Sequence, residues 1–190
     1  MERQSYDFVI VGAGSSGCTL ANRLTADGKH SVLLLEAGPK DSSPWIHIPL
    51  GYAKTFKDPK YNWCLDTEAD PGMNGRSFYL PRGKTLGGSS SINGLIYLRG
   101  QLEDYDLWES LGNRGWGSRD VLPYFKKSEH NVRGASDYHG ADGELGVSDV
   151  NHRHELATAF IEGCVEAGMP RNDDFNGAEY TEWRFNPGVP

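Results

Sequence analysis

Three glycines and one acidic residue near the beginning of the chain have the types and the spacing of a nucleotide-binding site. Gly12, Gly14 and Gly17 form the pattern G-x-G-x-x-G, and Glu36 follows after about 20 residues. The glycines permit a tight turn and let the backbone approach a pyrophosphate, while the acid can accept hydrogen bonds from a ribose hydroxyl. An acid at this position disfavours a 2′-phosphate, so the pattern argues against NADP and leaves FAD and NAD as alternatives.

The residues around the glycines predict the elements that must position them. Phe8–Val11 is a short apolar run suited to a strand buried on both faces, and Val32–Leu35 is a second run that leads into Glu36. Between them, apolar residues at helical spacing predict a helix that stops at Asp27-Gly28. The first amides of this helix and the positive end of its dipole make an anion site beside the glycines. The alternative is a turn whose glycines are only structural, and the order of strand, helix, strand and acid argues against it.

A second glycine-rich stretch lies further along the chain, over residues 81–100. Gly87-Gly88 would let the backbone pass close to a ligand, and Ser89 or Ser90 is expected to cap a helix whose first amides point outward. These features would form a second cradle, for an anion or for the edge of a ring. On these residues alone, a flexible turn of the same composition is an equal alternative.

The composition is that of an ordinary globular chain and excludes several classes of function. The 190 residues carry a formal net charge of −7, and the sequence pI is about 5.3, so nucleic acid is not an expected partner. No apolar run approaches the ~20 residues that a membrane-spanning helix needs, and residues 1–5 lack the features of a secretory signal. We therefore expect no transmembrane segment and a cytoplasmic location.

The cysteines and histidines predict neither a disulfide framework nor a metal site. Cys18, Cys64 and Cys164 are odd in number and far apart, which fits reduced thiols. His152 and His154 have no third His or Cys near them in the sequence, so no metal is expected. His139 has no partner that the sequence identifies, and we expect a surface or hydrogen-bonded structural histidine.

Beyond the second strand, the sequence predicts short elements first and helices later. Four prolines between residues 39 and 59 exclude long helices there. Residues 61–67 and 76–80 alternate aromatic with polar side chains around turn signals, which predicts a β-hairpin or two short strands. The remaining expected elements are a helix from Leu102 that ends near Gly112, a helix over 118–127 with Ser118 as its N-cap, a loop and short strand over 138–150, and a helix over 154–167.

Together these stretches give the chain a resemblance to a known family. It resembles the N-terminal part of the glucose-methanol-choline (GMC) oxidoreductases over residues 5–178, and the choline-dehydrogenase-like alcohol dehydrogenases most of all. The resemblance implies an α/β fold, namely a partial Rossmann-like FAD-binding βαβ domain of the GMC type with an added hairpin and helices. The segments that carry it are Gly12–Gly17 with Glu36-Ala37-Gly38, Gly83–Asp106, Trp108–Trp116 with Val121–Ser128, and Asn172–Gly177.

The resemblance also implies the cofactor and its contacts. The cofactor is FAD, with the first glycine turn at its pyrophosphate, Glu36 at the adenosine ribose and residues 87–94 along the flavin. Some members of the family carry, at the position of Ile92, a histidine that bonds covalently to the flavin, so non-covalent FAD is expected here. The implied cofactor-binding residues are Gly12, Gly14, Ser15, Ser16, Gly17, Glu36, Ala37, Arg82, Gly87, Gly88, Ser89, Ser90, Asn93 and Gly94.

The reaction that the resemblance implies is the oxidation of a CH–OH group. A primary alcohol, whether choline-like, aliphatic or aryl, would give a hydride to flavin N5 while a base removes the hydroxyl proton. In the family that base is a histidine near the C-terminus of a much longer chain, so no catalytic residue is expected among these 190 residues. No motif here predicts the electron acceptor.

Residues 179–190 depart from the family pattern, and three hypotheses follow. We expect this end to be truncated or altered in its reading frame. The chain is then the FAD-binding part of an alcohol-oxidising flavoenzyme, a catalytically inactive nucleotide-binding fragment, or an NAD-dependent oxidoreductase, against which the run Gly83–Asp106 argues. The flavoenzyme interpretation requires that the loop over Leu86–Ser91 lie against the turn over Gly12–Gly17.

Overall fold

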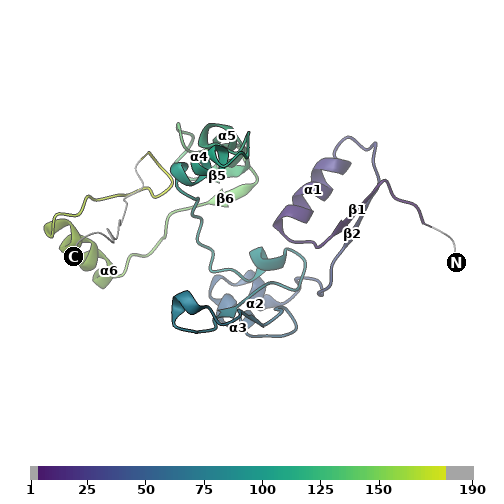
Figure 1. Ribbon diagram of the computed structural model, residues 1–190, viewed down its shortest axis with the longest axis horizontal. Helices are drawn as coiled ribbons and strands as arrows, with labels where there is room; N and C mark the ends of the chain where they lie inside the picture. Colours follow the sequence, from purple (N-terminus) through teal and green to yellow (C-terminus); the bar gives the residue numbers. More distant parts are fainter. Residues whose placement is uncertain (1–3, 179–190) are drawn as a thin grey trace. The chain divides into compact units, whose positions relative to one another are not determined.

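A computed structural model describes residues 4–178 of the chain, so residues 179–190, which we expected to depart from the family pattern, lie outside the described residues. The chain divides into two compact units, residues 1–96 and residues 97–190. Each unit combines helices with short strands, so the fold is of the mixed α/β kind (Figure 1).

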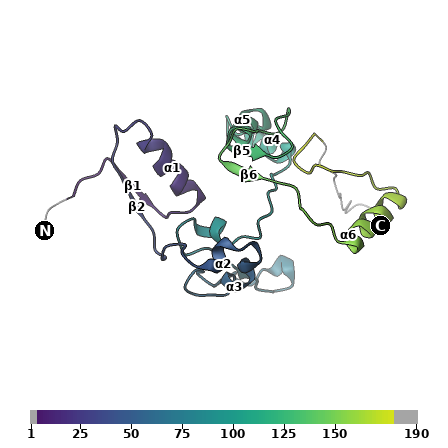
Figure 2. The same ribbon diagram turned by 180° about the vertical axis from the view of Figure 1, so that it is seen from behind.

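The first unit begins with two parallel strands and the helix that joins them. Strand β1 (Phe8–Val11) pairs with β2 (Val32–Leu35), in a register that runs from Phe8 opposite Val32 to Val11 opposite Leu35. Helix α1 (Ser15–Thr25) connects them and lies along the pair in both views (Figures 1 and 2). These three elements confirm the predicted order of strand, helix and strand.

The expectation that these strands are buried on both faces is wrong for the residues that the structure describes. Val9 is 58% exposed and Val11 is 84% exposed. Within residues 4–178 the sheet has only these two strands, and α1 is the helix that packs against them. The apolar pattern identified the strands correctly. It also predicts packing on both faces of the sheet, and residues 4–178 do not provide that packing.

The rest of the first unit consists of short elements, as its prolines predict. They are helices α2 (Pro44–His47) and α3 (Tyr52–Thr55), the 3₁₀ turns η1 (Pro49–Gly51) and η2 (Pro71–Met73), and strands β3 (Leu65–Asp66) and β4 (Tyr79–Leu80). β3 and β4 are antiparallel, which confirms the hairpin in a shorter form than expected. The unit's last element is the 3₁₀ turn η3 (Gly88–Ser91).

Asn62 fixes the segment that leads from the hairpin to η3. Its side chain is 1% exposed, and its Nδ2 donates to the Phe56 carbonyl at 2.7 Å. Its Oδ1 accepts from the amides of Cys64 at 2.9 Å and Arg82 at 3.0 Å. Asn62 therefore ties the end of α3 to both strands' flanking residues and fixes the backbone at Arg82, where the glycine-rich stretch begins.

The second unit contains three helices and two short strands within its described residues. Their bounds are α4 (Leu102–Ser110), α5 (Ser118–Ser128), β5 (Glu129–Asn131), β6 (Leu145–Val147) and α6 (Glu155–Glu166). The three expected helices and the strand near residue 146 are confirmed, whereas β5, which pairs in parallel with β6, was not predicted. Tyr105 of α4 packs against Phe125 of α5, with ring centroids 5.6 Å apart.

One predicted helix cap differs from the structure. Ser118 was expected as the N-cap of α5, but the N-cap is Gly117 and Ser118 is the first helical residue. The amide of Ser118 donates instead to Asp106 Oδ1 of α4 at 2.8 Å. A side chain from a neighbouring helix therefore satisfies one of the first amides of α5, which makes a serine cap unnecessary.

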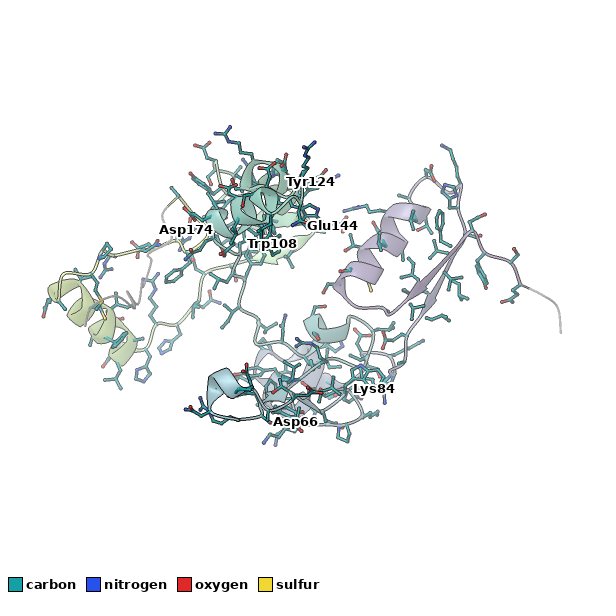
Figure 3. All side chains as sticks on the ribbon, viewed as in Figure 1. Asp66, Lys84, Trp108, Tyr124, Glu144 and Asp174 are labelled. Atoms are coloured by element: carbon teal, nitrogen blue, oxygen red, sulfur yellow. The ribbon has the colours of Figure 1, made fainter. Side chains whose placement is uncertain are left out.

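A buried charged cluster holds the second unit together. Glu129 is fully buried and accepts from Arg99 Nη2 at 2.6 Å and from His139 Nδ1 at 2.9 Å. The other ring nitrogen of His139 lies 2.8 Å from Asp174 Oδ2, and Asp174 is labelled in Figure 3. His139 is thus a hydrogen-bonded structural histidine, one of the two expected roles, and its partners were not predictable from the sequence.

Residues 4–178 contain neither a membrane-spanning helix nor a cluster of metal ligands. None of the helices there is long and apolar enough to cross a membrane. No three of the His, Cys, Asp and Glu side chains in this part of the chain gather in a group that could hold a metal ion.

Candidate functional site

The turn between β1 and α1 has the geometry of an anion site. Gly12 has φ +96°, which favours glycine, and its amide donates to the Leu35 carbonyl at 2.7 Å. A Cβ on Gly17 would lie 2.0 Å from the Gly12 carbonyl oxygen, so only glycine lets α1 pack this closely on the turn. Helix α1 has no side-chain cap and no acidic residue in its first turn. Its first amides and the positive end of its dipole are therefore available to a phosphate.

The second glycine-rich stretch lies directly against this turn. The Gly87 amide donates to the Ala13 carbonyl at 2.8 Å, and Gly14 and Gly87 form an isolated β-bridge. A Cβ on Gly88 would come within 2.8 Å of the Gly14 Cα. The predicted meeting of the two glycine stretches, separated by about 70 residues of sequence, is confirmed.

Glu36, at the end of β2, is hydrogen-bonded to the glycine turn between β1 and α1. Its Oε2 accepts from the Ala13 amide at 2.8 Å, and its Oε1 accepts from the Gly38 amide at 2.9 Å. A carboxylate has about four acceptor positions, so both oxygens can still accept from a ribose hydroxyl. The side chain thus ties the end of β2 to the glycine turn and keeps acceptor capacity for a ligand.

The serines after Gly88 do not cap a helix, which corrects the sequence prediction. η3 is a single 3₁₀ turn whose N-cap is Gly87, at φ +85°. Ser89 Oγ accepts from the Gly83 amide at 3.1 Å, and Ser90 Oγ donates to the Gly87 carbonyl at 2.6 Å. The hydroxyls bond to the loop's own backbone, so they stabilise the shape of the loop and do not extend a helix.

The other predicted cofactor residues occupy three places in the first unit. Ser15 and Ser16 are exposed at the start of α1, and Ala37 is exposed next to Glu36. Asn93 and Gly94 are exposed just after η3, where Asn93 Oδ1 accepts from the Leu95 amide at 3.0 Å. Arg82 Nη1 donates to the Pro81 carbonyl at 2.9 Å, so in this structure its guanidinium is bonded next to its own backbone.

Sequence reasoning missed two residues that shape this site. Thr85 is fully buried and its Oγ1 donates to the Pro39 carbonyl, and Asn62 fixes the backbone at Arg82. Thr85 lies within the run Gly83–Asp106, but its residue type gave it no role there, and Asn62 lies in no such run. Only the hydrogen bonds of the two side chains to distant backbone groups reveal what they do. Lys84, which is labelled in Figure 3, lies next to Thr85 and places its Nζ 4.8 Å from the centroid of the Trp63 ring.

Comparison with protein families matches residues 6–183 to the family described as GMC oxidoreductase. The chain is 52% identical over 174 residues to an alcohol dehydrogenase [acceptor] of Pseudomonas putida, a match that covers 91% of this chain and 32% of that protein. It is 48% identical to the mitochondrial choline dehydrogenase of Homo sapiens over 92% of this chain and 31% of that protein. The chain therefore spans about a third of the length of these relatives.

Solved structures of oxidoreductases also resemble this chain. The chain superposes on a pyridoxine 4-oxidase from Mesorbium loti with a TM-score of 0.83 and 37% identity, over 90% of this chain and 34% of that one. An FAD-dependent oxidoreductase from Chaetomium thermophilum superposes with a TM-score of 0.73 and 33% identity, over 87% of this chain and 30% of that one.

Proposed function

Because this chain belongs to the GMC oxidoreductase family, we propose that it supplies the FAD-binding part of an enzyme that oxidises alcohols. The observation that carries the proposal is the bond between the Gly87 amide and the Ala13 carbonyl, which places the loop over Leu86–Ser91 on the turn over Gly12–Gly17. A cofactor long enough to reach both stretches, with phosphates in its middle, suits this arrangement.

The residues present fit FAD. A Cβ built on Gly12 or Gly14 would meet no other atom within 4 Å, so a phosphate can approach the backbone from that side. In this proposal β1, α1 and β2 are a Rossmann-like βαβ unit that holds the pyrophosphate at the start of α1 and the adenosine ribose at Glu36. The residues that would hold the pyrophosphate and the ribose are Gly12, Gly14, Ser15, Ser16, Gly17, Glu36 and Ala37, and those along the flavin are Arg82, Gly87, Gly88, Ser89, Ser90, Asn93 and Gly94.

Binding and orientation are the contributions of this chain to the chemistry. When bound, FAD supplies the acceptor for a hydride from the carbon of a primary alcohol, and the names of the relatives suggest choline and similar alcohols as the substrate class. The first turn of α1 would neutralise phosphate charge, and the loop over Leu86–Ser91 would fix the ring beside it. Ile92 offers no nucleophile for a covalent link, so the cofactor would dissociate. We assign the base to no residue of this chain.

The direct test is cofactor binding by the purified chain. We expect flavin absorbance to stay with the protein through gel filtration, and added FAD to bind with at least tenfold preference over NAD. Denaturing precipitation should release the flavin, because the attachment is non-covalent. A chain that binds NAD and ignores FAD would contradict the proposal.

A second candidate is a nucleotide-binding module without turnover of its own. The exposure of Val11 favours it, because 84% of this side chain faces solvent in a strand that the pattern expects to be covered. We expect FAD binding without measurable oxidation of a primary alcohol by an artificial electron acceptor when these 190 residues are assayed alone. Steady turnover under these conditions would favour the first candidate over the second.

A further inference from the structure

Residues 84–88 are anchored at three points in the first unit. The Lys84 amide donates to the Tyr61 carbonyl at 2.8 Å, the Leu86 amide to the Pro39 carbonyl at 3.1 Å, and the Gly87 amide to the Ala13 carbonyl at 2.8 Å. The segment therefore runs from the hairpin, past the turn that follows β2, to the glycine turn that precedes α1. Its position decides where the loop over Leu86–Ser91 stands relative to the anion site.

Thr85 is the buried centre of this segment. Its side chain is fully buried, and its Oγ1 donates to the Pro39 carbonyl at 2.9 Å. The same carbonyl accepts from the Leu86 amide, so Pro39 receives two bonds from two consecutive residues. Breaking this bond would leave a buried hydroxyl without an acceptor, which would destabilise the fold. The bond therefore holds Thr85 at a fixed distance from Pro39.

Gly38 closes the contact from the opposite side. A Cβ built on Gly38 would lie 1.8 Å from the Lys84 carbonyl oxygen and 2.5 Å from the Thr85 amide nitrogen. The two backbones therefore touch only because residue 38 has no side chain. We call the contact between Gly38-Pro39 and Lys84-Thr85 the joint.

We infer that Thr85 is a positioning residue, whose bond to the Pro39 carbonyl fixes the loop over Leu86–Ser91 relative to Glu36 and the end of β2. The inference rests on the proposed function. Glu36 and the first turn of α1 come before the joint in the sequence, and η3 follows it directly. FAD would contact Glu36, the first turn of α1 and η3, whereas ADP would contact only Glu36 and the first turn of α1. A weakened joint should therefore impair the binding of FAD and leave that of ADP intact.

The variant that tests this inference is Thr85→Val, which keeps the shape of the side chain and removes the hydroxyl. We expect its affinity for FAD to fall about tenfold, the usual effect of losing one buried hydrogen bond, and its affinity for ADP to stay within about twofold. Thr85→Ser, which restores the hydroxyl, should bind FAD with nearly the wild-type affinity. Thr55→Val is the matched control, because Thr55 is 2% exposed and its hydroxyl bonds only within α3, to the Tyr52 carbonyl.

A second readout does not depend on any cofactor. In the apo chain, Thr85→Val should speed the hydrogen exchange of the Leu86 and Gly87 amides about tenfold, while the amides paired between β1 and β2 keep their wild-type rates. Gly38→Ala opens the joint from the other side and should give the same local pattern. If Thr85→Val does not fold, the exchange rates of Gly38→Ala test the inference in its place.

The outcomes separate this inference from the proposed function. If wild-type chain binds neither FAD nor ADP, the proposed function is overturned, and the exchange rates still decide whether Thr85 holds the joint. If wild-type chain binds FAD, the inference is overturned when Thr85→Val binds FAD as tightly as wild type or when FAD and ADP affinities fall together. Unchanged exchange at Leu86 and Gly87 in both variants would also overturn it.

Discussion

Glu129 shows how much of this fold depends on single polar residues. Its carboxylate is fully buried and bonded to Arg99, His139, Asn131 and the Gly140 amide. Burial raises the pKa of Glu129, but the hydrogen bonds from His139, Asn131 and Gly140 and the attraction of Arg99 outweigh it, so the pKa lies below its ordinary value of 4.5. The ionised form is therefore the one that the folded chain stabilises.

Removing this charge should be costly. We predict that Glu129→Gln lowers the free energy of unfolding by about 3 kcal/mol, because it leaves Arg99 buried without a counter-charge. Urea denaturation followed by circular dichroism measures the change. Asp149→Asn is the matched control, since Asp149 pairs with Arg133 at the surface, where both side chains are about half exposed, and we expect a much smaller loss. Equal losses in the two variants would contradict the account of the cluster.

The same carboxylate makes stability depend on pH in one direction. Because the folded-state pKa of Glu129 lies below its unfolded value, its contribution is complete above the ordinary value of 4.5 and is lost as the pH falls through the folded-state pKa. We predict that the urea midpoint falls as the pH is lowered below about 4.5. The fall should be smaller in Glu129→Gln, and an identical pH profile in both proteins would rule Glu129 out as its source.

At the scale of the elements, the βαβ unit was predictable and the second glycine loop was only partly so. β1, α1 and β2 follow from apolar periodicity and glycine spacing, which are local in the sequence. η3 was expected as a capped helix because serines often cap, but hydroxyls that bond back to their own loop leave no periodic signal. The N-cap of α5 was missed for a related reason, since its partner Asp106 comes from another helix.

Gly17 should be the most sensitive position of α1. We predict that Gly17→Ala lowers FAD affinity by more than tenfold and destabilises the first unit, because the new Cβ would lie 2.0 Å from the Gly12 carbonyl oxygen. Titration of flavin fluorescence measures the affinity. Gly163→Ala is the control within α6, where a Cβ would meet nothing within 4 Å, and it should raise stability by about 0.5–1 kcal/mol. Wild-type FAD affinity in Gly17→Ala would contradict the packing argument.

At the scale of the whole molecule, the sequence predicted which apolar residues form strands. It did not predict whether other parts of the chain would cover their side chains. Within residues 4–178 only Ala13, Tyr61 and Ile92 are buried apolar residues, while Val9 and Val11 are exposed. The chain spans about a third of the length of its relatives. The buried cluster around Glu129 and the joint at Thr85 were equally unpredictable, because both depend on hydrogen bonds between residues that are far apart in sequence.

Exposed apolar strands have a measurable consequence. We predict that the isolated chain binds a hydrophobic fluorescent dye in its native state, because extended apolar surface on a folded protein attracts such ligands. Val11→Thr should reduce the dye signal with little change in stability, since 84% of the side chain is already exposed. Dye binding that is absent in wild-type chain, or unaffected by this substitution, would show that the surface is covered in solution.

The measurement that tests the central claim most directly is a titration of the isotope-labelled chain with FAD, followed by the amide resonances of both glycine stretches. The two stretches lie together in the structure, with the Gly87 amide 2.8 Å from the Ala13 carbonyl. We predict that the resonances of Gly12–Gly17 and of Gly87–Gly94 shift together and saturate at one equivalent of FAD. A response confined to one stretch, or in neither, would contradict a single cofactor held by both.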